Sequence, residues 1–125
     1  MTPDNQPYFN PSATDRVPIS FEEQVEAMNE LIQEGKIRYY GVANETPWGI
    51  AKWHSTAKEL GLKGPVAASN PYSLITKNDV ETHLIEAVYH CNMSFIGYSP
   101  LCEGVLTGTP RPPFFLLNSS LCCFA

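Results

Sequence analysis

The sequence predicts an α/β fold in which short parallel strands alternate with amphipathic helices. Helix-like and strand-like segments follow one another three times between residues 20 and 98, which is typical of βα units around a parallel sheet. Each strand-like segment also ends in a polar loop, where α/β proteins bind their ligands. These patterns leave open whether the sheet is doubly wound or belongs to a barrel.

The first helix is predicted to begin after Ser20, which forms a capping box with Glu23 and so satisfies backbone donors of the first turn. Gly35 is placed to end this helix in a left-handed cap. Apolar residues recur with a helical period and predict one packed face, made of Phe21, Val25, Met28, Leu31 and Ile32. The acidic face is expected to be solvated and carries Glu22, Glu26, Glu30 and Glu34.

A first strand is predicted over residues 37–42, because its apolar and aromatic run suggests burial on both faces. Tyr39 and Tyr40 are then expected to be core or interface residues. Thr46 caps a second helix, with Pro47 at the first helical position and Gly61 after the end. The inner stripe of this helix is predicted to consist of Ile50, Trp53, Ala57 and Leu60.

The remaining elements repeat the same alternation. A second strand is predicted over residues 65–69, a loop over residues 70–77 and a third strand over residues 94–98. Asn78 or Asp79 is expected to cap the helix between the two strands. The inward face of that helix is predicted to hold Val80, Leu84, Ala87, Val88 and Cys91.

Composition and charge narrow the classes of function. The chain has 125 residues, 43% hydrophobic and 17% charged, which suits one modest globular domain. A net charge of −5 with eight Lys and Arg argues against nucleic acid as a partner. The longest apolar stretch, residues 112–125, is interrupted by polar residues and is shorter than the ~20 residues of a membrane span, so no membrane partner is expected.

The four cysteines, Cys91, Cys102, Cys122 and Cys123, have no metal-ligand spacing, so no metal site is predicted and reduced thiols are expected. We therefore expect an intracellular, cytoplasmic protein, with a plastid as the alternative if an N-terminal transit segment is missing. Residues 1–18 hold four of the eleven prolines and predict an irregular segment. Residues 109–125 have no period or cap and predict an unrelated, disordered tail beyond a domain of residues 19–108.

Three strings in this order resemble the aldo-keto reductase superfamily, and most closely its Tas-like branch. They are Gly35-Lys-Ile-Arg-Tyr-Tyr-Gly-Val-Ala-Asn-Glu-Thr-Pro-Trp-Gly49, Asn70-Pro-Tyr-Ser-Leu74 and Tyr98-Ser-Pro-Leu-Cys-Glu-Gly-Val-Leu-Thr-Gly108. The resemblance covers about residues 18–108 and implies part of a (β/α)8 TIM barrel. On that layout the chain holds the helix after strand four and then strands five to seven.

The resemblance also implies NADP as cofactor and carbonyl reduction by hydride transfer in the full-length family. Asn44 is expected to hold the nicotinamide carboxamide, next to Ala43 where the family has a hydroxyl. Ser69 stands before Asn70, in a place where family members usually have a Gln. Asn44 also has an ordinary interpretation, because Asn suits strained turns.

The third strand end would contact the rest of the nicotinamide nucleotide. Tyr98 matches the aromatic residue that stacks on the nicotinamide ring, although an aromatic residue at this place can also simply cap a strand end. Ser99 and Leu101 match the start of the pyrophosphate loop. Glu103 stands where the family often has an apolar or small residue, and a carboxylate near phosphates would repel them.

The catalytic Asp, Tyr, Lys and His of the family would all precede residue 1, so no catalytic residue is predicted here. We therefore expect a fragment of an NADP-dependent aldo-keto reductase that is inactive as this chain. Two alternatives are a non-catalytic nucleotide-binding or regulatory module and a truncated gene product without its own role. Strands cut from a closed barrel leave unpaired edges, so we also expect self-association through those edges.

Overall fold

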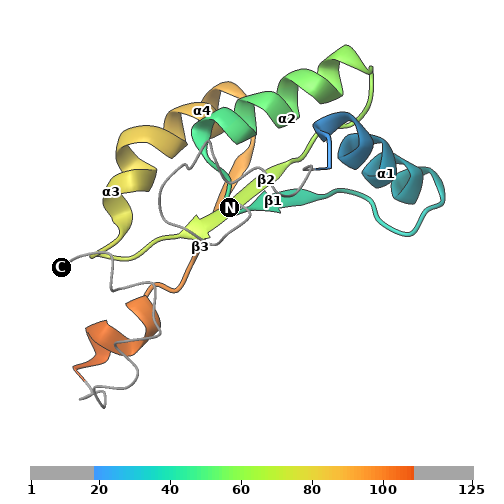
Figure 1. The fold of residues 1–125 in the computed structure, drawn as a ribbon. Coiled ribbons are helices and arrows are strands. Elements are labelled where there is room, and N and C mark those ends of the chain that lie inside the picture. The colour runs from blue at the N-terminus through green and yellow to red at the C-terminus, as the bar shows by residue number, and fades with distance from the viewer. Residues whose placement is uncertain (1–18, 109–125) are drawn as a thin grey trace.

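The structure is a computed structural model that describes residues 19–108. Its elements are α1 (Phe21–Gln33), β1 (Gly41–Ala43), α2 (Pro47–Glu59), β2 (Ala67–Pro71), α3 (Lys77–Asp79), η1 (Val80–Leu84), α4 (Ile85–His90), β3 (Ser94–Tyr98) and η2 (Cys102–Thr107). The strands form one parallel sheet in the order β1-β2-β3 (Figure 1). The predicted α/β class is confirmed, as an open sheet in this part of the chain. The predictions for residues 1–18 and 109–125 lie outside the described residues.

Helix α1 begins and ends as its capping signals predict. The Ser20 hydroxyl accepts a hydrogen bond from the Glu23 amide at 3.1 Å, and Gly35 adopts a left-handed φ of 73° after the helix. Val25 is fully buried. The buried Asn29 was not predicted: its amide exchanges two 2.9 Å hydrogen bonds with the backbone of Lys63, which ties α1 to the loop before β2.

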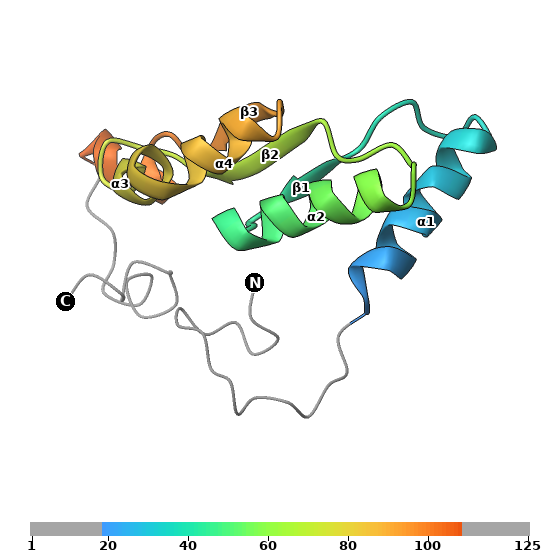
Figure 2. The ribbon, with the colours of Figure 1, turned by 90° about the horizontal axis from the view of Figure 1, so that it is seen from above.

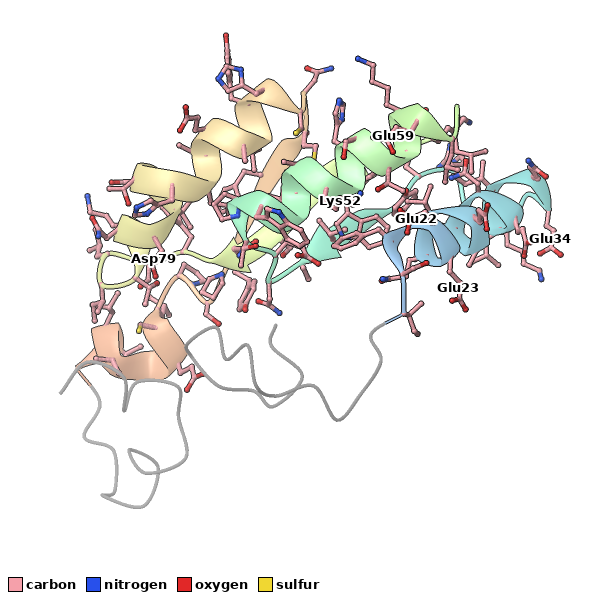
Figure 3. The ribbon with its side chains drawn as sticks, turned by 45° about the horizontal axis from the view of Figure 1, so that its top comes forward. Glu22, Glu23, Glu34, Lys52, Glu59 and Asp79 are labelled. Atoms are coloured by element: carbon pink, nitrogen blue, oxygen red, sulfur yellow. The ribbon has the colours of Figure 1, made fainter. Side chains whose placement is uncertain are left out.

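The acidic face of α1 is exposed, as expected. Glu23 and Glu34 project outward from the helix in Figure 3. Glu22 lies 3.9 Å from Lys52 of α2, and because both side chains are well exposed this pair adds little stability.

Helix α2 follows its predicted caps, because the Thr46 hydroxyl accepts from the Gly49 amide at 3.1 Å and Gly61 has a φ of 67°. Ile50, Trp53 and Ala57 are buried as predicted. The prediction for Leu60 was wrong, since its side chain is 39% exposed. Gly61 turns the chain back after the helix, and Leu62 packs against the core instead.

Two apolar clusters form the core. The first joins α2, β2, η1 and α4 through the buried residues Ile50, Ala68, Val80, Leu84, Val88 and Met93. The second joins α1, α2 and the chain before β1 through Val25, Tyr40, Trp53 and Ala57. Helices α2 and α4 lie on the same side of the sheet (Figure 1), whereas α1 and α3 lie at opposite ends of the molecule (Figure 2). No helix within residues 19–108 is long and apolar enough to cross a membrane.

The opposite face of the sheet has no helix on it in the described part of the chain. Ala68 and its register partners Val42 and Phe95 contact the helix-side core. Because side chains alternate along a strand, Ser69 and its partner Ile96 point to the other face. Ile96 is accordingly 54% exposed.

The bounds of two strands differ from the prediction. The first strand, expected over residues 37–42, spans only Gly41–Ala43 and is not buried on both faces. Tyr40, which directly precedes this strand, packs in the second apolar cluster. Tyr39 is 68% exposed and is not a core residue. The second strand, expected over residues 65–69, spans Ala67–Pro71, because β3 continues to pair with it as far as Pro71. The third strand has the predicted bounds.

The prediction that Asn78 or Asp79 caps the third helix was also wrong, since both residues lie inside α3. The helix follows Thr76 as its cap residue, and the Ser73 hydroxyl holds the preceding turn by accepting hydrogen bonds from the amides of Ile75 and Thr76 at 3.2 and 3.1 Å. The helix then widens into the π-helical turn η1 before α4. Val80, Leu84 and Val88 still face the core as predicted.

Ile50→Ala is expected to lower the free energy of unfolding by about 2–5 kcal/mol, because it leaves a cavity beside Ala68 in the first cluster. Urea denaturation followed by circular dichroism measures this loss. The matched control is Ile85→Ala, which removes the same atoms from an exposed position of α4 and should cost far less. Equal losses in the two variants would contradict the described core.

Candidate functional site

Polar residues from the ends of β1 and β3 meet across the carboxyl edge of the sheet. The Tyr98 hydroxyl donates a hydrogen bond to the Asn44 side-chain oxygen Oδ1, although 54 positions separate the two residues. Asn44 follows β1 and Tyr98 ends β3, so this bond crosses over the end of β2. The strand ends are thereby fixed relative to one another at the place where α/β proteins bind ligands.

Asn44 is held in an unusual backbone conformation. Its φ is 57°, in the left-handed region where Asn is tolerated better than most residues. Its amide donates to the Ser69 carbonyl at 2.9 Å, which continues the β1/β2 ladder by one residue. The side chain is therefore aimed toward β3 by a fixed backbone.

Asn70 and Glu45 hold the loop between β1 and α2 through hydrogen bonds. The Asn70 side-chain nitrogen Nδ2 donates to the Glu45 carbonyl at 3.1 Å, and the Glu45 carboxylate accepts from the Trp53 indole at 3.3 Å. Asn70 Oδ1 is buried and has no hydrogen-bond partner among the described residues. Asn70 thus lies in the predicted site, but its amide nitrogen is used to hold the loop.

Glu45 is the site residue that the sequence analysis missed. Its carboxylate lies against Gly49, where an added Cβ would come within 2.1 Å of Oε2, so the glycine makes room for it. A signal was present in the sequence. Glu45 directly precedes the cap of α2, and a carboxylate near a helix N-terminus is favourable.

The other predicted contacts lie around the same edge. Ser69 is half-buried on the helix-free face, opposite Ala43 in the register. Ser99 and Leu101 follow β3 and are exposed. Their carbonyls accept backbone hydrogen bonds from Cys102 at 2.9 Å and from Gly104 at 3.0 Å, so they form a tight loop leading into η2. Glu103 is exposed and lies in η2 itself, directly after Cys102.

Left-handed backbone is concentrated at this edge. Five described residues other than glycine have a positive φ, and four of them follow β1 or β3: Asn44, Ser99, Cys102 and Glu103. Such conformations cost energy and tend to cluster at functional sites. The observation points to the carboxyl edge, rather than to the surface of the helices, as the functional region.

The shifted ionisable groups lie away from this edge or are unsuited to proton transfer there. Burial raises the pKa of Tyr40, whose hydroxyl donates to the Lys63 carbonyl. The hydrogen bond from Tyr72 to Glu81 raises the pKa of the Tyr72 phenol and lowers the pKa of the Glu81 carboxyl. A tyrosine that acts as an acid near neutral pH needs the opposite shift.

The described residues hold no group of three His, Cys, Asp or Glu side chains able to bind a metal ion. His54, His83 and His90 are exposed on helical segments, away from the carboxyl edge. Cys91 and Cys102 are free thiols, and Cys122 and Cys123 lie outside the described residues. The side chains gathered at the carboxyl edge are the amides of Asn44 and Asn70 and the phenol of Tyr98.

Replacing Asn44 by Ala should destabilise the chain more than replacing it by Gly, by about 1 kcal/mol, because only Ala is strained at this φ. Both variants lose the bond to Tyr98. Tyr98→Phe removes that bond without changing residue 44 and should cost about 0.5–1.5 kcal/mol. Urea denaturation of the three variants measures these differences. Equal stability of the Ala and Gly variants would show that residue 44 is not held in this conformation.

Comparisons with known proteins identify relatives of this chain. The chain is 36% identical over 92 residues to an aldo-keto reductase of Babesia bovis, covering 72% of this chain and 32% of that protein. It is 37% identical over 98 residues to protein tas of Escherichia coli, covering 78% and 28%. It is 34% identical over 87 residues to a probable voltage-gated potassium channel subunit beta of rice, covering 70% and 26%.

The matched segment is thus about a quarter to a third of the length of these relatives. The sequence profile of the aldo/keto reductase family matches residues 3–115, which include the whole described region and the carboxyl edge with Asn44 and Tyr98. On this match and the shared identities, the chain belongs to the aldo/keto reductase family.

Proposed function

We propose that residues 19–108 form part of a (β/α)8 barrel and supply the nicotinamide side of an NADP site. The bond between Tyr98 and Asn44 across the sheet edge carries this proposal. It brings an amide and an aromatic ring together at the carboxyl ends of parallel strands, where barrel enzymes bind their ligands. An amide is suited to the carboxamide of nicotinamide, and a ring is suited to stacking on its pyridine.

Asn70 extends the same surface. Its oxygen Oδ1 is buried without a partner among the described residues, and a buried acceptor gains free energy when a donor reaches it. The carboxamide NH2 of a bound nicotinamide is a donor of the right kind. Ser69 presents a hydroxyl on the helix-free face of the same strand, and Ser99 and Leu101 would lie along the pyrophosphate.

Carbonyl reduction needs an acid that protonates the forming alkoxide. In residues 19–108 the Tyr98 hydroxyl donates to an amide oxygen rather than lying against a Lys or His. The two tyrosines with shifted pKa, Tyr40 and Tyr72, are shifted upward. The described residues therefore offer groups that bind and orient a cofactor, and the proton-transfer groups of a complete reductase would have to come from another part of a barrel.

A second function, a nucleotide-binding or regulatory module, is favoured by the same retained pair of Asn44 and Tyr98. One relative carries the name of a probable channel subunit rather than that of an enzyme. This function requires the chain alone to bind nucleotide tightly. A truncated product without its own role requires that it does not bind at all.

Saturation-transfer NMR of the chain with NADP+ is expected to show the strongest saturation at the nicotinamide protons, because Asn44 and Tyr98 lie on that side of the proposed site. Tyr98→Ala should remove this signal. Tyr89→Ala is the matched control, since Tyr89 is exposed on α4. Saturation centred on the adenine protons, or an unchanged signal in Tyr98→Ala, would refute the proposed site. A micromolar Kd from calorimetry would favour the regulatory module.

The chain alone is expected to show no oxidation of NADPH with a panel of aldehydes above a heat-denatured control. The reason is that residues 19–108 offer no acid of the kind described above. Absorbance at the NADPH band follows the reaction, and the aldo-keto reductase of Babesia bovis is the positive control. Turnover by the chain that disappears in Tyr98→Phe would assign Tyr98 a catalytic role and overturn this expectation.

A further inference from the structure

Tyr72 directly follows β2 and contacts β3 through both its backbone and its ring. Its amide donates a hydrogen bond to the Tyr98 carbonyl at 2.9 Å, which extends the pairing of the two strands beyond Pro71. Its ring meets the ring of Phe95 edge to face, with the centroids 5.7 Å apart. Tyr72 is therefore bound to the last part of β3, the strand that ends in Tyr98.

Gly97 leaves the space that the Tyr72 side chain fills. A Cβ on Gly97 would lie 3.0 Å from the Tyr72 Cβ and 3.4 Å from its ring atom Cδ1, so a larger residue would push Tyr72 away from β3. Gly97 is not among the described glycines with a left-handed φ, so the glycine serves this close approach rather than a strained backbone. Gly97 and Phe95 share the helix side of the sheet, because side chains alternate along a strand. The Tyr72 ring thus supports the end of β3 from the helix side.

The far end of the Tyr72 side chain is bound to Glu81. The Tyr72 hydroxyl donates to Glu81 Oε1 at 2.8 Å, and the other carboxylate oxygen lies 3.4 Å from Lys77 Nζ. The hydrogen bond raises the pKa of the Tyr72 phenol and lowers the pKa of the Glu81 carboxyl, so near neutral pH the donor keeps its proton and the acceptor stays charged. A hydrogen bond to a charged acceptor is stronger than one between neutral groups. The Tyr72 side chain is thereby held at both ends.

Glu81 belongs to a segment that is anchored in the core. It lies in the π-helical turn η1, after which the Ile85 amide donates to the Val80 carbonyl. Val80 and Leu84, which flank Glu81 in this turn, are buried in the first apolar cluster. Such turns are rare and are often found at functional sites. The core therefore fixes the position of Glu81, and through it that of Tyr72.

Tyr98 has support from two directions at the carboxyl edge. Toward β1 its hydroxyl donates to Asn44, and toward β2 its carbonyl accepts from Tyr72. Its own side chain is 37% exposed, and the next residue, Ser99, has a left-handed φ of 54°, so the chain turns directly after it. A displacement of Tyr72 would therefore move Tyr98 and change its contact with Asn44.

We propose that Tyr72 and Glu81 are positioning residues that place the Tyr98 ring for a bound nicotinamide. This inference rests on the proposed function, because it names what holds the ring of that site. Glu81 acts only through its bond to Tyr72. A tyrosine that merely covered Phe95 would need its ring alone, so the Tyr72 hydroxyl is the group that separates positioning from packing.

The first test removes the hydroxyl or its acceptor and follows Tyr98 by NMR. Tyr72→Phe keeps the ring and removes the hydrogen bond, and Glu81→Ala removes the acceptor. Both should weaken the cross-peak between the side-chain amide protons of Asn44 and the ring protons of Tyr98. Glu81→Gln should retain most of it, because an amide oxygen can accept the same bond.

Two control variants remove the same atoms elsewhere. Tyr89→Phe and Glu86→Ala change exposed positions of α4 and should leave the cross-peak unchanged. Urea denaturation of every variant measures its stability separately. A purely structural role of the Tyr72–Glu81 bond would lower stability without moving Tyr98.

Binding of NADP+ gives the second readout, followed by titration of the saturation at the nicotinamide protons. The Kd should rise about two- to tenfold in Tyr72→Phe and Glu81→Ala, the effect of one lost hydrogen bond, and should stay near the native value in Glu81→Gln. An unchanged cross-peak or an unchanged Kd in Tyr72→Phe and Glu81→Ala would overturn the proposal. A native chain that binds no NADP+ would refute the proposed function, whereas the cross-peak would still decide whether the pair positions Tyr98.

Discussion

The packing of helix α2 on the sheet is the constraint on which the rest of the described chain depends. Its inner face belongs to both apolar clusters, because Ile50 packs with Ala68 and α4 while Trp53 and Ala57 pack with α1. The start of α2 is fixed as well, through Thr46 as cap. Whatever holds α2 in place therefore also fixes the loop that joins it to β1.

The loop between β1 and α2 connects the packed core to the candidate site. Trp53 lies in the core and bonds to Glu45, and Asn70 holds the same residue from β2. With Glu45 held on two sides, Asn44 has little freedom and stays in its left-handed conformation. The bond to Tyr98 then sets the distance between two strand ends. The positions of Asn44 and Tyr98 at the carboxyl edge of the sheet thus depend on the packing of the buried face of α2.

Most of the helix caps and inward faces could be predicted from the sequence, because each depends on residues close together in the chain. Ser20, Thr46 and Gly61 are local signals of this kind. The meeting of Asn44 and Tyr98 at one edge follows from the parallel order of the strands, and their role as a site stays a prediction. The strand bounds could not be predicted, since β2 ends where β3 stops pairing with it. Nor could the long-range partners of Asn29 and Glu45, because their hydrogen bonds reach Lys63, 34 positions away, and Asn70, 25 positions away. The predicted Asn78/Asp79 cap was wrong because the helix begins earlier, at Lys77 after Thr76, and the Ser73 hydroxyl holds the turn before it.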